Sequence, residues 1–360
     1  MAKELWKGNE AIAEAAIRAG CDCFFGYPIT PQNEIPEYMS LHMPQHGKVF
    51  VQAESEVAAI NMVYGAAAAG KRAMTSSSSP GISLKQEGIS YIAGAELPAV
   101  IINMSRGGPG LGTIQASQAD YFQSTRGGGN GDYRTMVLAP QSIQEAVDLV
   151  QDAFDLADKY RNPVLILADG MIGQMMEPIE WKQRPSVELP PKDWAATGRH
   201  GREKNNFVTS LRIDAPDCEL HNVHIQSKYD RMAEEELRYE TIGCDGQEPE
   251  IILASYGTTA RICWSAINRL ERKYGIKAGL FRPITLFPFP YDQLHQIASR
   301  PGVKAVISVE MSQGQMVDDV KLAVNGAAPV HFFGRAGGSI PTVDEVADFA
   351  ASVVKGGDGK

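Results

Sequence analysis

Two proline residues bracket a short segment that could present polar groups to a ligand. Residues 26–31 read Gly-Tyr-Pro-Ile-Thr-Pro and follow a hydrophobic run that predicts a strand. Pro28 and Pro31 fix their own φ angles and keep the residues before them out of the helical region. We therefore expect a rigid turn that places the Thr30 hydroxyl at the carboxyl end of a strand. Open α/β sheets bind their ligands at that end.

A carboxylate begins an apolar, alanine-rich segment about twenty-five residues later. Residues 54–59 read Glu-Ser-Glu-Val-Ala-Ala, and the pattern predicts a helix over 54–69 that is buried on most sides, as in a subunit interface. The helix dipole alone can explain an acidic residue in the first turn. A carboxylate among small apolar side chains nevertheless needs a partner. Glu56 is the candidate catalytic residue, and Glu54 is the rival for that role.

A run of serines follows the next predicted strand, at residues 72–75. Residues 76–81 read Ser-Ser-Ser-Ser-Pro-Gly, and their backbone N–H groups could hold an anion. The run could equally be a polar loop. It is not a phosphate-binding loop of the Walker type, because the glycine and lysine spacing is absent.

Arg106 follows a strongly apolar segment, residues 98–104, that predicts a buried parallel strand. A guanidinium at the ligand end of a sheet can bind a carboxylate through two hydrogen bonds. The alternative is a structural pair with a nearby acid. The glycines at 108, 110 and 112 do not match the dinucleotide-binding pattern. A second glycine-rich segment, 127–134, predicts a mobile loop that could act as a lid.

Bulk properties exclude several classes of protein. The chain has 360 residues, a net charge of −9 and a pI near 5.4, which argues against binding to nucleic acid through phosphate contacts. No run of eighteen apolar residues is present and the N-terminus lacks the apolar core of a signal peptide, so we expect a cytoplasmic protein without a membrane span. The five cysteines include no C-x-x-C pair, so we expect neither an iron–sulfur cluster nor a metal site in this chain.

Strands and helices alternate along most of the sequence, which predicts an α/β fold with two doubly wound, parallel-sheet domains. The first domain is expected over residues 1–176 and the second over residues 248–360. The segment between them, 177–247, is rich in proline and charge and has little periodicity. We interpret it as a connecting arm with some local structure that could wrap a partner.

These segments together resemble the alpha subunit of 2-oxoacid:ferredoxin oxidoreductases over nearly the whole chain. The resemblance rests on residues 26–31 (GYPITP), 54–59 (ESEVAA), 75–81 (TSSSSPG), 106–109 (RGGP), 257–259 (GTT) and 282–288 (RPITLFP). Three further segments look most like the branched-chain members, which use 2-oxoisovalerate (3-methyl-2-oxobutanoate): 108–112 (GPGLG), 115–121 (QASQADY) and 128–134 (GGNGDYR).

The resemblance implies a pyrimidine-type thiamine-diphosphate-binding domain followed by a transketolase C-terminal-like domain. The cofactor would be shared with a beta subunit that supplies the diphosphate and magnesium motif. [4Fe-4S] clusters would lie only in partner subunits, in particular a ferredoxin-like delta subunit, and a gamma subunit would complete a heteromer that associates as a dimer. The complex would convert a 2-oxoacid and coenzyme A to acyl-CoA and CO2, and pass electrons to ferredoxin.

The resemblance also implies roles for individual residues. Glu56 would contact N1′ of the cofactor's aminopyrimidine and promote proton movement there. Thr30 would hydrogen-bond the substrate, and Arg106 would bind its carboxylate. The further cofactor-pocket candidates are Tyr27, Pro28, Ile29, Ser77 and Ser78.

Two alternatives stay open at the level of sequence. The first is a 2-oxoglutarate or pyruvate enzyme of the same family; a second basic residue would favour 2-oxoglutarate, and Arg126 and Arg134 are the nearby candidates. The second is a non-catalytic assembly subunit whose partners carry all the chemistry.

Overall fold

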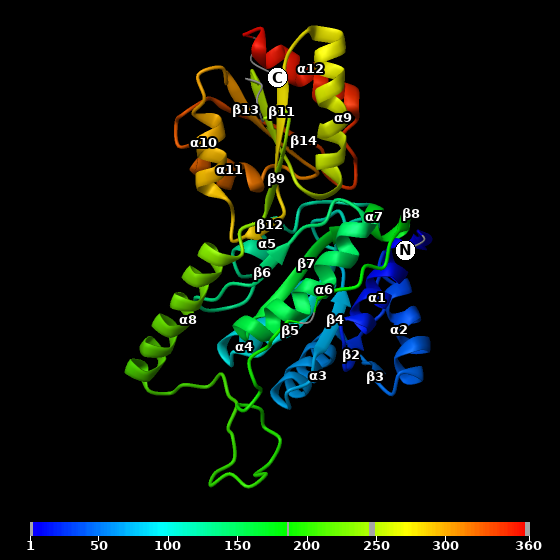
Figure 1. Ribbon diagram of the computed structural model, residues 1–360, viewed down its shortest axis with the longest axis vertical. Helices are drawn as coiled ribbons and strands as arrows, with labels where there is room; N and C mark the ends of the chain where they lie inside the picture. The colour runs from blue at the N-terminus through cyan, green and yellow to red at the C-terminus, as the bar shows by residue number, and fades with distance from the viewer. Residues whose placement is uncertain (1–2, 186, 245–248, 357–360) are drawn as a thin grey trace.

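The first part of the chain is built on a seven-stranded sheet (Figure 1). The computed structural model describes residues 3–185, 187–244 and 249–356. The strand order is β12-β6-β7-β5-β4-β2-β3, and neighbouring strands are parallel except for β12 against β6. The strands are β2 (Cys23–Gly26), β3 (Val49–Gln52), β4 (Ala73–Ser77), β5 (Ala99–Ser105), β6 (Met136–Leu138), β7 (Pro163–Asp169) and β12 (Thr285–Phe287).

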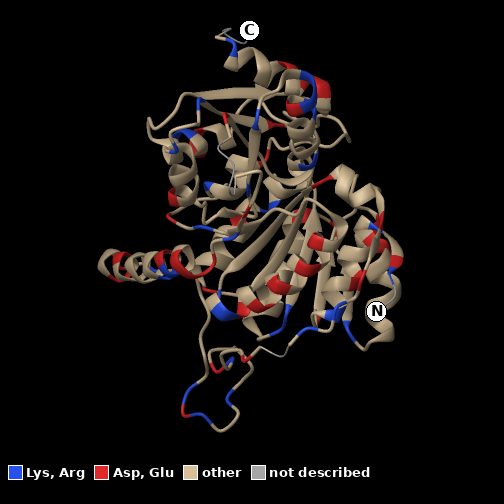
Figure 2. Ribbon diagram, turned by 45° about the horizontal axis from the view of Figure 1, so that its top comes forward, with Lys and Arg blue, Asp and Glu red and all other residues tan. Residues whose placement is uncertain are grey.

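Helices cover both faces of this sheet, and each face has its own apolar core. One face is covered by α1 (Gly8–Arg18), α2 (Glu34–Gln45) and α6 (Ile143–Tyr160), and the other by α3 (Glu56–Ala68) and α4 (Ser79–Gly94). Figure 2 shows that charged residues lie mainly on helices and connections, and Asp169 is the one charged residue in the seven strands. A sheet buried on both faces requires such apolar strands.

The second part is a smaller α/β unit with a five-stranded sheet in the order β14-β13-β10-β11-β9. Its strands are β9 (Tyr239–Ile242), β10 (Ile251–Ala254), β11 (Ala278–Pro283), β13 (Ala305–Glu310) and β14 (Val330–Gly334). Its helices are α9 (Gly257–Tyr274), α10 (Tyr291–Ala298), α11 (Met316–Val324) and α12 (Val343–Val354). The strands are parallel except for β9, which runs antiparallel to β11. The predicted fold class, two α/β domains with mainly parallel sheets, is confirmed.

Buried polar contacts join the two parts at the carboxyl edge of the first sheet. Gln118 donates to the carbonyl oxygen of Tyr256 (2.8 Å), while its own side-chain oxygen accepts from the Thr259 hydroxyl (2.6 Å) and the Met311 N–H (2.9 Å). The chain also returns from β11 to add β12 to the edge of the first sheet. One apolar core contains residues of both parts, so they pack as a single unit.

The predicted connecting arm contains more regular structure than its sequence suggests. The helix α8 (Ala215–Glu235) lies within it, and β9 belongs to the second sheet. At its other end, β8 (Met176–Ile179) pairs with β1 (Glu4–Lys7) across the predicted boundary at residue 176. The boundary between 247 and 248 lies outside the described residues, so the division at these positions stays a prediction.

Three short elements complete the described secondary structure. These are α5 (Tyr121–Thr125), α7 (Gly170–Gln174) and the two-stranded β1–β8 pair. Among the described helices, none is long and apolar enough to cross a membrane.

We predict that Arg282 contributes to the stability of the contact between the two parts. Its side chain is almost fully buried and donates two hydrogen bonds to Glu145 of α6 (both 2.9 Å) and one to Glu240 of β9 (2.8 Å). Removing one member of a buried ion pair leaves the other uncompensated. Because both carboxylates retain some solvent contact, Arg282→Met should cost about 2 kcal/mol and lower the midpoint of urea unfolding.

A matched control is available in the second part of the chain. Arg269 makes a single, exposed ion pair with Asp344 (2.6 Å). Exposed pairs contribute about 0–1 kcal/mol, so Arg269→Met should leave the midpoint almost unchanged. Equal effects of the two substitutions would contradict the structural role given to Arg282.

Candidate active site

The ends of four neighbouring strands bring the predicted site residues to one edge of the first sheet. In the order β5-β4-β2-β3, these strands end just before Arg106, within the serine run, at the proline-bracketed turn and shortly before Glu56. Adjacent strands lie about 4.8 Å apart, so the four strand ends span about 14 Å. Segments up to eighty residues apart in the sequence therefore contribute to a single site.

The proline-bracketed turn is open to solvent and is held from behind by Gln32. Tyr27 and Pro28 are exposed. The fully buried Gln32 accepts a hydrogen bond from the Ser76 hydroxyl of β4 (2.5 Å) and donates to the Tyr27 carbonyl oxygen (3.5 Å). The sequence analysis did not identify Gln32, although its position directly after Pro31 was a signal.

The N-terminus of α3 distinguishes the two candidate carboxylates. Ser55 caps the helix by accepting from the Ala58 N–H (3.1 Å), so Glu56 is the first helical residue and Glu54 lies outside. Glu56 is 7% exposed, whereas Glu54 is exposed. Within the described parts of the chain, the Glu56 carboxylate makes no hydrogen bond or ion pair. A buried carboxylate with free acceptor atoms requires a donor from elsewhere.

Gly81 allows Glu56 and Ser77 to approach each other beside α4. A Cβ atom at position 81 would lie 2.1 Å from Ser77 Oγ and 2.8 Å from Glu56 Oε1, so no larger residue fits without displacing them. Ser77 Oγ is buried and has no hydrogen-bond partner in the described structure. Two oxygen groups without a hydrogen-bond partner among the described residues, those of Glu56 and Ser77, therefore lie beside one glycine.

Arg106 is directed toward the turn by backbone carbonyl groups. Its Nη1 donates to the Thr30 carbonyl oxygen (2.8 Å) and its Nη2 to the Leu111 carbonyl oxygen (3.0 Å). Its Nε is buried without a partner, and no acidic residue in the described ranges pairs with it. Two of the five guanidinium donors are therefore used, and the other three make no hydrogen bond in the described structure. The nearest acid with which the Arg106 charge interacts is Asp120, so the alternative of a structural charge pair stays open.

The serine run does not form the open anion-binding loop that the sequence allowed. β4 continues to Ser77 and α4 begins at Ser79, so the run joins two elements directly. Ser78 donates to the Met104 carbonyl oxygen (2.7 Å), and Ser79 donates to Asp120 (2.6 Å). Of the four serines, Ser77 alone has a free hydroxyl within the described structure.

Asp120 is a buried acid that the sequence analysis did not identify. Its carboxylate accepts from Ser79 and from Asn103 Nδ2 (2.9 Å). Burial raises the pKa of Asp120, and these hydrogen bonds oppose the shift. It lines a second cavity, of about 550 Å³, that also contacts Arg106 and reaches the second part of the chain. Asp120 thus supports the backbone around Arg106.

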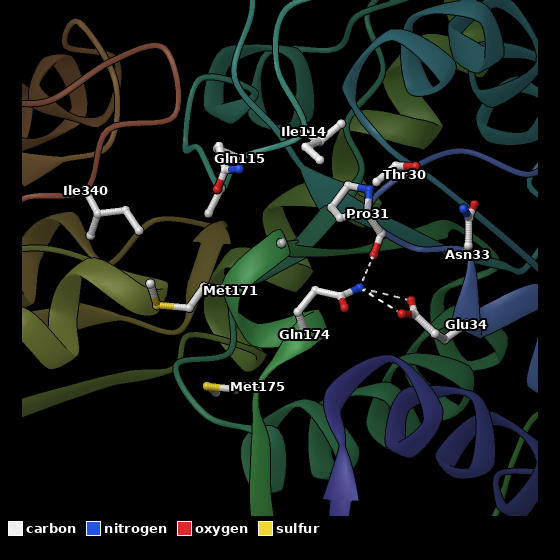
Figure 3. Close-up of a pocket in the computed structure, with 12 residues that line it drawn as sticks. Thr30, Pro31, Asn33, Glu34, Ile114, Gln115, Met171, Gln174, Met175 and Ile340 are labelled. Carbon is white, nitrogen blue, oxygen red and sulfur yellow. Dashed lines mark hydrogen bonds between the residues drawn. The ribbon is translucent and has the colours of Figure 1, made fainter.

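A cavity of about 570 Å³ opens beside Thr30 and Pro31 (Figure 3). Its largest apolar side chains are Ile114, Met171, Met175 and Ile340, which come from three separate segments. Among the described residues that line it, none is a lysine or arginine. The cavity can therefore accept an apolar group.

The polar side of the same cavity is formed by Glu34 and Gln174, as Figure 3 shows. Gln174 donates to the Pro31 carbonyl oxygen (2.9 Å) and to Glu34 (3.0 Å). Burial alone would raise the pKa of Glu34, but hydrogen bonds from Lys7, Asn9 and Gln174 outweigh it and lower that pKa. Glu34 is consequently a fixed negative charge on this wall.

The second glycine-rich segment is packed against α4. Ser90 donates to the Asn130 carbonyl oxygen (2.6 Å), and the Gly129 N–H donates to the Tyr133 hydroxyl (2.9 Å). Arg126 pairs with Asp319 of the second part (3.0 Å), and Arg134 donates to the Thr125 carbonyl oxygen (3.1 Å). The loop is anchored along α4 and does not cover the cavity beside Thr30, so the lid expected there is not found.

Comparisons with known proteins agree with this architecture. The family model described as pyruvate flavodoxin/ferredoxin oxidoreductase, thiamine-diphosphate-binding, matches residues 14–238. The model for pyruvate:ferredoxin oxidoreductase core domain II matches residues 249–346. The first region contains the first sheet except β12, and the second region contains the second sheet except β9.

Two relatives that match nearly the whole chain are also similar to it in sequence. The ketoisovalerate oxidoreductase subunit VorB of Methanothermobacter marburgensis is 53% identical, covering 94% of this chain and 95% of the relative. The 2-oxoglutarate synthase subunit KorA of Methanothermobacter thermautotrophicus is 36% identical, covering 94% of this chain and 96% of the relative.

A solved 2-oxoglutarate:ferredoxin oxidoreductase from Magnetococcus marinus, with 2-oxoglutarate, coenzyme A and succinyl-CoA bound, superposes with a TM-score of 0.83. The two are 26% identical over 98% of this chain, which spans 65% of the length of that solved chain. With family models that together match most of its length and relatives well above 30% identity, this chain belongs to the 2-oxoacid:ferredoxin oxidoreductase family.

Proposed function

We propose that this chain is the alpha subunit of a branched-chain 2-oxoacid:ferredoxin oxidoreductase. The complex would convert 3-methyl-2-oxobutanoate and coenzyme A to the acyl-CoA and CO2, and would pass the electrons to ferredoxin. The observation that carries the substrate assignment is the apolar cavity beside Thr30, lined by isoleucine and methionine without a basic residue among its described lining. The identity with ketoisovalerate oxidoreductase subunits supports the same assignment.

The residues at the sheet edge fit the pyrimidine half of thiamine diphosphate. Glu56 makes no hydrogen bond in the described structure, Ser77 has an unpartnered buried hydroxyl, and Tyr27 and Pro28 are exposed at the end of the neighbouring strand β2. An aminopyrimidine ring offers N–H groups that would satisfy these acceptors. Ile29 and Ser78 complete the proposed pocket, although the Ser78 hydroxyl already donates to Met104.

When bound, thiamine diphosphate supplies the nucleophilic carbon that adds to the 2-oxo group and takes up the electron pair left by CO2. Glu56 would share a proton with N1′ of the pyrimidine, and its burial strengthens that interaction because water is excluded. A carboxylate in this position can receive and return the proton as the reaction proceeds. Glu56 is therefore the proposed acid–base group of the chain.

Arg106 and Thr30 would bind the reacting end of the 2-oxoacid. Three of the five guanidinium N–H groups have no protein partner in the described structure, and a guanidinium can form two parallel hydrogen bonds to a carboxylate. The Thr30 hydroxyl would donate to the neighbouring oxo group. Arg106 also donates to the Thr30 carbonyl oxygen, so a hydrogen bond holds these two residues next to each other.

The cavity favours a branched apolar group over a second carboxylate. A distal carboxylate, as in 2-oxoglutarate, would lie near Glu34, whose charge is paired with Lys7 (2.5 Å), and no lysine or arginine among the described lining residues would pair with it. Arg126 and Arg134, the basic candidates from sequence, are bound to Asp319 and to the Thr125 carbonyl oxygen. The 2-oxoglutarate alternative is consequently disfavoured.

We predict that Met171 sets the substrate preference. Loss of methylene groups that contact a substrate costs about 1–3 kcal/mol, so Met171→Ala should lower kcat/KM for 3-methyl-2-oxobutanoate by about tenfold or more. The value for pyruvate, which lacks the branch, should change far less. The measurement is a panel of 2-oxoacids assayed with coenzyme A and ferredoxin on the reconstituted complex.

Met176 supplies the control for this prediction. It lies on β8 close in sequence to Met171, is 58% exposed, and does not line the cavity. Met176→Ala should leave the whole panel unchanged. A wild-type complex that prefers 2-oxoglutarate, or a Met171→Ala variant that loses all substrates equally, would contradict the assignment.

The proposed partners follow from membership of the family. Magnesium would come with a beta subunit that supplies the diphosphate and magnesium motif. The [4Fe-4S] clusters would lie in a ferredoxin-like delta subunit, with a gamma subunit completing the heteromer and its dimer. Val57, Leu84 and Tyr91 form exposed apolar positions on α3 and α4, which suits a subunit contact next to Glu56.

Coenzyme A and ferredoxin are reactants of the cell interior, so we place the complex in the cytoplasm. A non-catalytic assembly subunit is the second candidate function. An assembly subunit would use the same apolar surface of α3 and α4 but would not need Glu56. The Glu56 variant discussed below therefore separates the two candidate functions.

A further inference from the structure

The Pro31 carbonyl oxygen is held by two amide side chains from separate parts of the chain. Asn9, the second residue of α1, donates to it through Nδ2 (2.8 Å), and Gln174, the last residue of α7, donates to it through Nε2 (2.9 Å). Both amide groups also donate to Glu34 (2.7 Å and 3.0 Å). Because Pro31 directly follows Thr30, these bonds lie where the turn borders the cavity (Figure 3).

Asn9 is fully buried, although its side chain is polar. Its Nδ2 group has two hydrogens, and they go to Pro31 and Glu34, while its Oδ1 has no partner in the described structure. Asn9 does not cap α1, since Lys7 is the residue before the first turn. Burying an amide is costly unless it is hydrogen-bonded. The bonds that compensate for this cost are those that Asn9 makes with the turn and with Glu34.

Two glycines of α7 allow this helix to approach the turn and α1. A Cβ atom at Gly170 would lie 2.9 Å from Pro31 Cγ, and a Cβ atom at Gly173 would lie 2.5 Å from Asn9 Oδ1. Larger residues at these two positions would therefore displace the groups that meet at the Pro31 carbonyl oxygen. The start of α1, the turn and α7 form one close contact.

Thr30 lies between two backbone groups that are held from opposite directions in the sequence. Arg106 donates to the Thr30 carbonyl oxygen (2.8 Å), and Asn9 and Gln174 donate to the next carbonyl oxygen along the chain, that of Pro31. Peptide bonds are planar, and the proline ring fixes the φ angle of Pro31. Holding the carbonyl groups before and after this ring therefore also fixes the backbone from which the Thr30 side chain projects.

We propose that Asn9 and Gln174 are positioning residues, which hold the Pro31 carbonyl group and thereby direct the Thr30 hydroxyl toward the oxo group of the 2-oxoacid. Asn9 is buried and does not line the cavity, so it acts through the turn. The effect on turnover rests on the proposed function. The hold on the turn is a property of this chain alone and can be measured without cofactor or substrate.

Amide hydrogen exchange of the full chain, followed by mass spectrometry, tests the hold on the turn. The turn contains two backbone hydrogen bonds, from the Gln32 N–H to the Ile29 carbonyl oxygen (3.1 Å) and from the Ile35 N–H to the Gln32 carbonyl oxygen (2.9 Å). Asn9→Ala leaves the Pro31 carbonyl oxygen with one of its two donors. Exchange in residues 29–35 should therefore become faster by about twofold to tenfold, as expected for the loss of one hydrogen bond.

Turnover of the reconstituted complex tests the consequence for Thr30. Misplacing a group next to the reacting atoms lowers rates strongly, so Asn9→Ala should lower kcat/KM by about tenfold. The factor should be the same for every 2-oxoacid, because all carry the oxo group, whereas the effect of Met171→Ala depends on the branch. Asn9→Ala/Thr30→Val should be no slower than Thr30→Val alone. Losses that multiply in the double variant would overturn the proposal.

Asn162 provides a matched control for the loss of a buried asparagine. It is also fully buried, its Nδ2 donates to the carbonyl oxygens of Arg134 and Pro163 (both 3.0 Å), and its Oδ1 has no partner in the described structure. It directly precedes β7, at the end of that strand opposite the site. Asn162→Ala should change neither the exchange in residues 29–35 nor kcat/KM. Equal changes in the two asparagine variants would overturn the proposal.

Gln174→Met is a milder variant in case Asn9→Ala does not fold. It keeps the length of the side chain and removes the other donor to Pro31, so it should change exchange and kcat/KM in the same directions by smaller factors. Wild-type exchange and turnover in this variant would overturn the proposal.

The outcomes also separate this inference from the proposed function. If Thr30→Val lowers turnover while the Asn9 and Gln174 variants behave as wild type, the inference fails alone. If exchange in residues 29–35 rises in Asn9→Ala but Thr30→Val turns over as wild type, the proposed role of Thr30 fails and the hold on the turn stands.

Discussion

Glu56→Gln is expected to remove turnover from the reconstituted complex while leaving thiamine diphosphate bound. The amide keeps the size of the side chain but cannot share a proton with N1′ as a carboxylate does. General acid–base groups contribute about a hundredfold to ten thousandfold to rate, so kcat should fall by that factor. The fold should be unaffected, because the Glu56 carboxylate makes no hydrogen bond within the described structure. Steady-state assay and cofactor titration of the same preparation give both values.

Glu54→Gln is the control for this substitution. Glu54 lies two residues earlier, is exposed, and precedes the helix cap at Ser55. It should leave turnover and cofactor affinity unchanged. Retained turnover in Glu56→Gln with cofactor fully bound would refute the acid–base role and favour the non-catalytic assembly subunit.

Arg106→Lys is expected to raise KM for the 2-oxoacid by about tenfold to a hundredfold. Lysine keeps the positive charge but cannot form two parallel hydrogen bonds, and each charged hydrogen bond contributes about 1.5–3 kcal/mol. It also cannot hold Thr30 and Leu111 together, so the turn loses part of its support. kcat at saturating substrate should fall less than kcat/KM does. Initial rates over a wide range of substrate concentrations separate the two parameters.

Arg134→Lys is the matched control for this effect. Arg134 donates to the Thr125 carbonyl oxygen and lies over the ring of Phe287, away from the cavity beside Thr30. Its replacement should leave KM unchanged. A larger KM effect from Arg134→Lys than from Arg106→Lys would show that the substrate carboxylate binds elsewhere.

Periodicity predicted the parts of the fold that are buried on both sides. The apolar run around Val100 and Ile102 could only be a central strand, and the structure has it as β5. α8 was missed because it buries only one narrow stripe, with Ile225, Tyr229 and Met232 facing the protein, while most of its surface is polar. A helix with so little apolar pattern has no signal that distinguishes it from a charged linker.

Residue types at strand ends predicted which segments form the site, whereas the partners of the individual side chains could not be predicted. The rule that parallel strands bind ligands at their carboxyl ends was sufficient to group Thr30, Glu56 and Arg106 before their contacts were known. It could not show that Gln32 supports the turn, because that bond to Ser76 joins residues far apart in the sequence. The cavity wall could not be predicted either, since Ile114 and Ile340 come from segments with no shared pattern.

The residue type of Lys85 did not predict that its side chain is buried. A lysine inside a predicted helix is expected on the solvent face. The glycines four residues before and three residues after it bring α3 close enough to enclose it. The spacing of Gly81, Lys85 and Gly88 was visible in the sequence, but its meaning depends on which helix packs against that face.

The exchange of the C2 proton of bound thiamine diphosphate with solvent deuterium tests the central claim most directly. The claim is that Glu56 of this chain governs proton movement on a cofactor whose other half is bound by a partner subunit. The rate can be followed by quenching the reconstituted complex at short times and measuring residual C2–H by nuclear magnetic resonance. The account predicts fast exchange in wild type and in Glu54→Gln, and exchange slowed by about a hundredfold or more in Glu56→Gln. Equal exchange rates in all three complexes would contradict it.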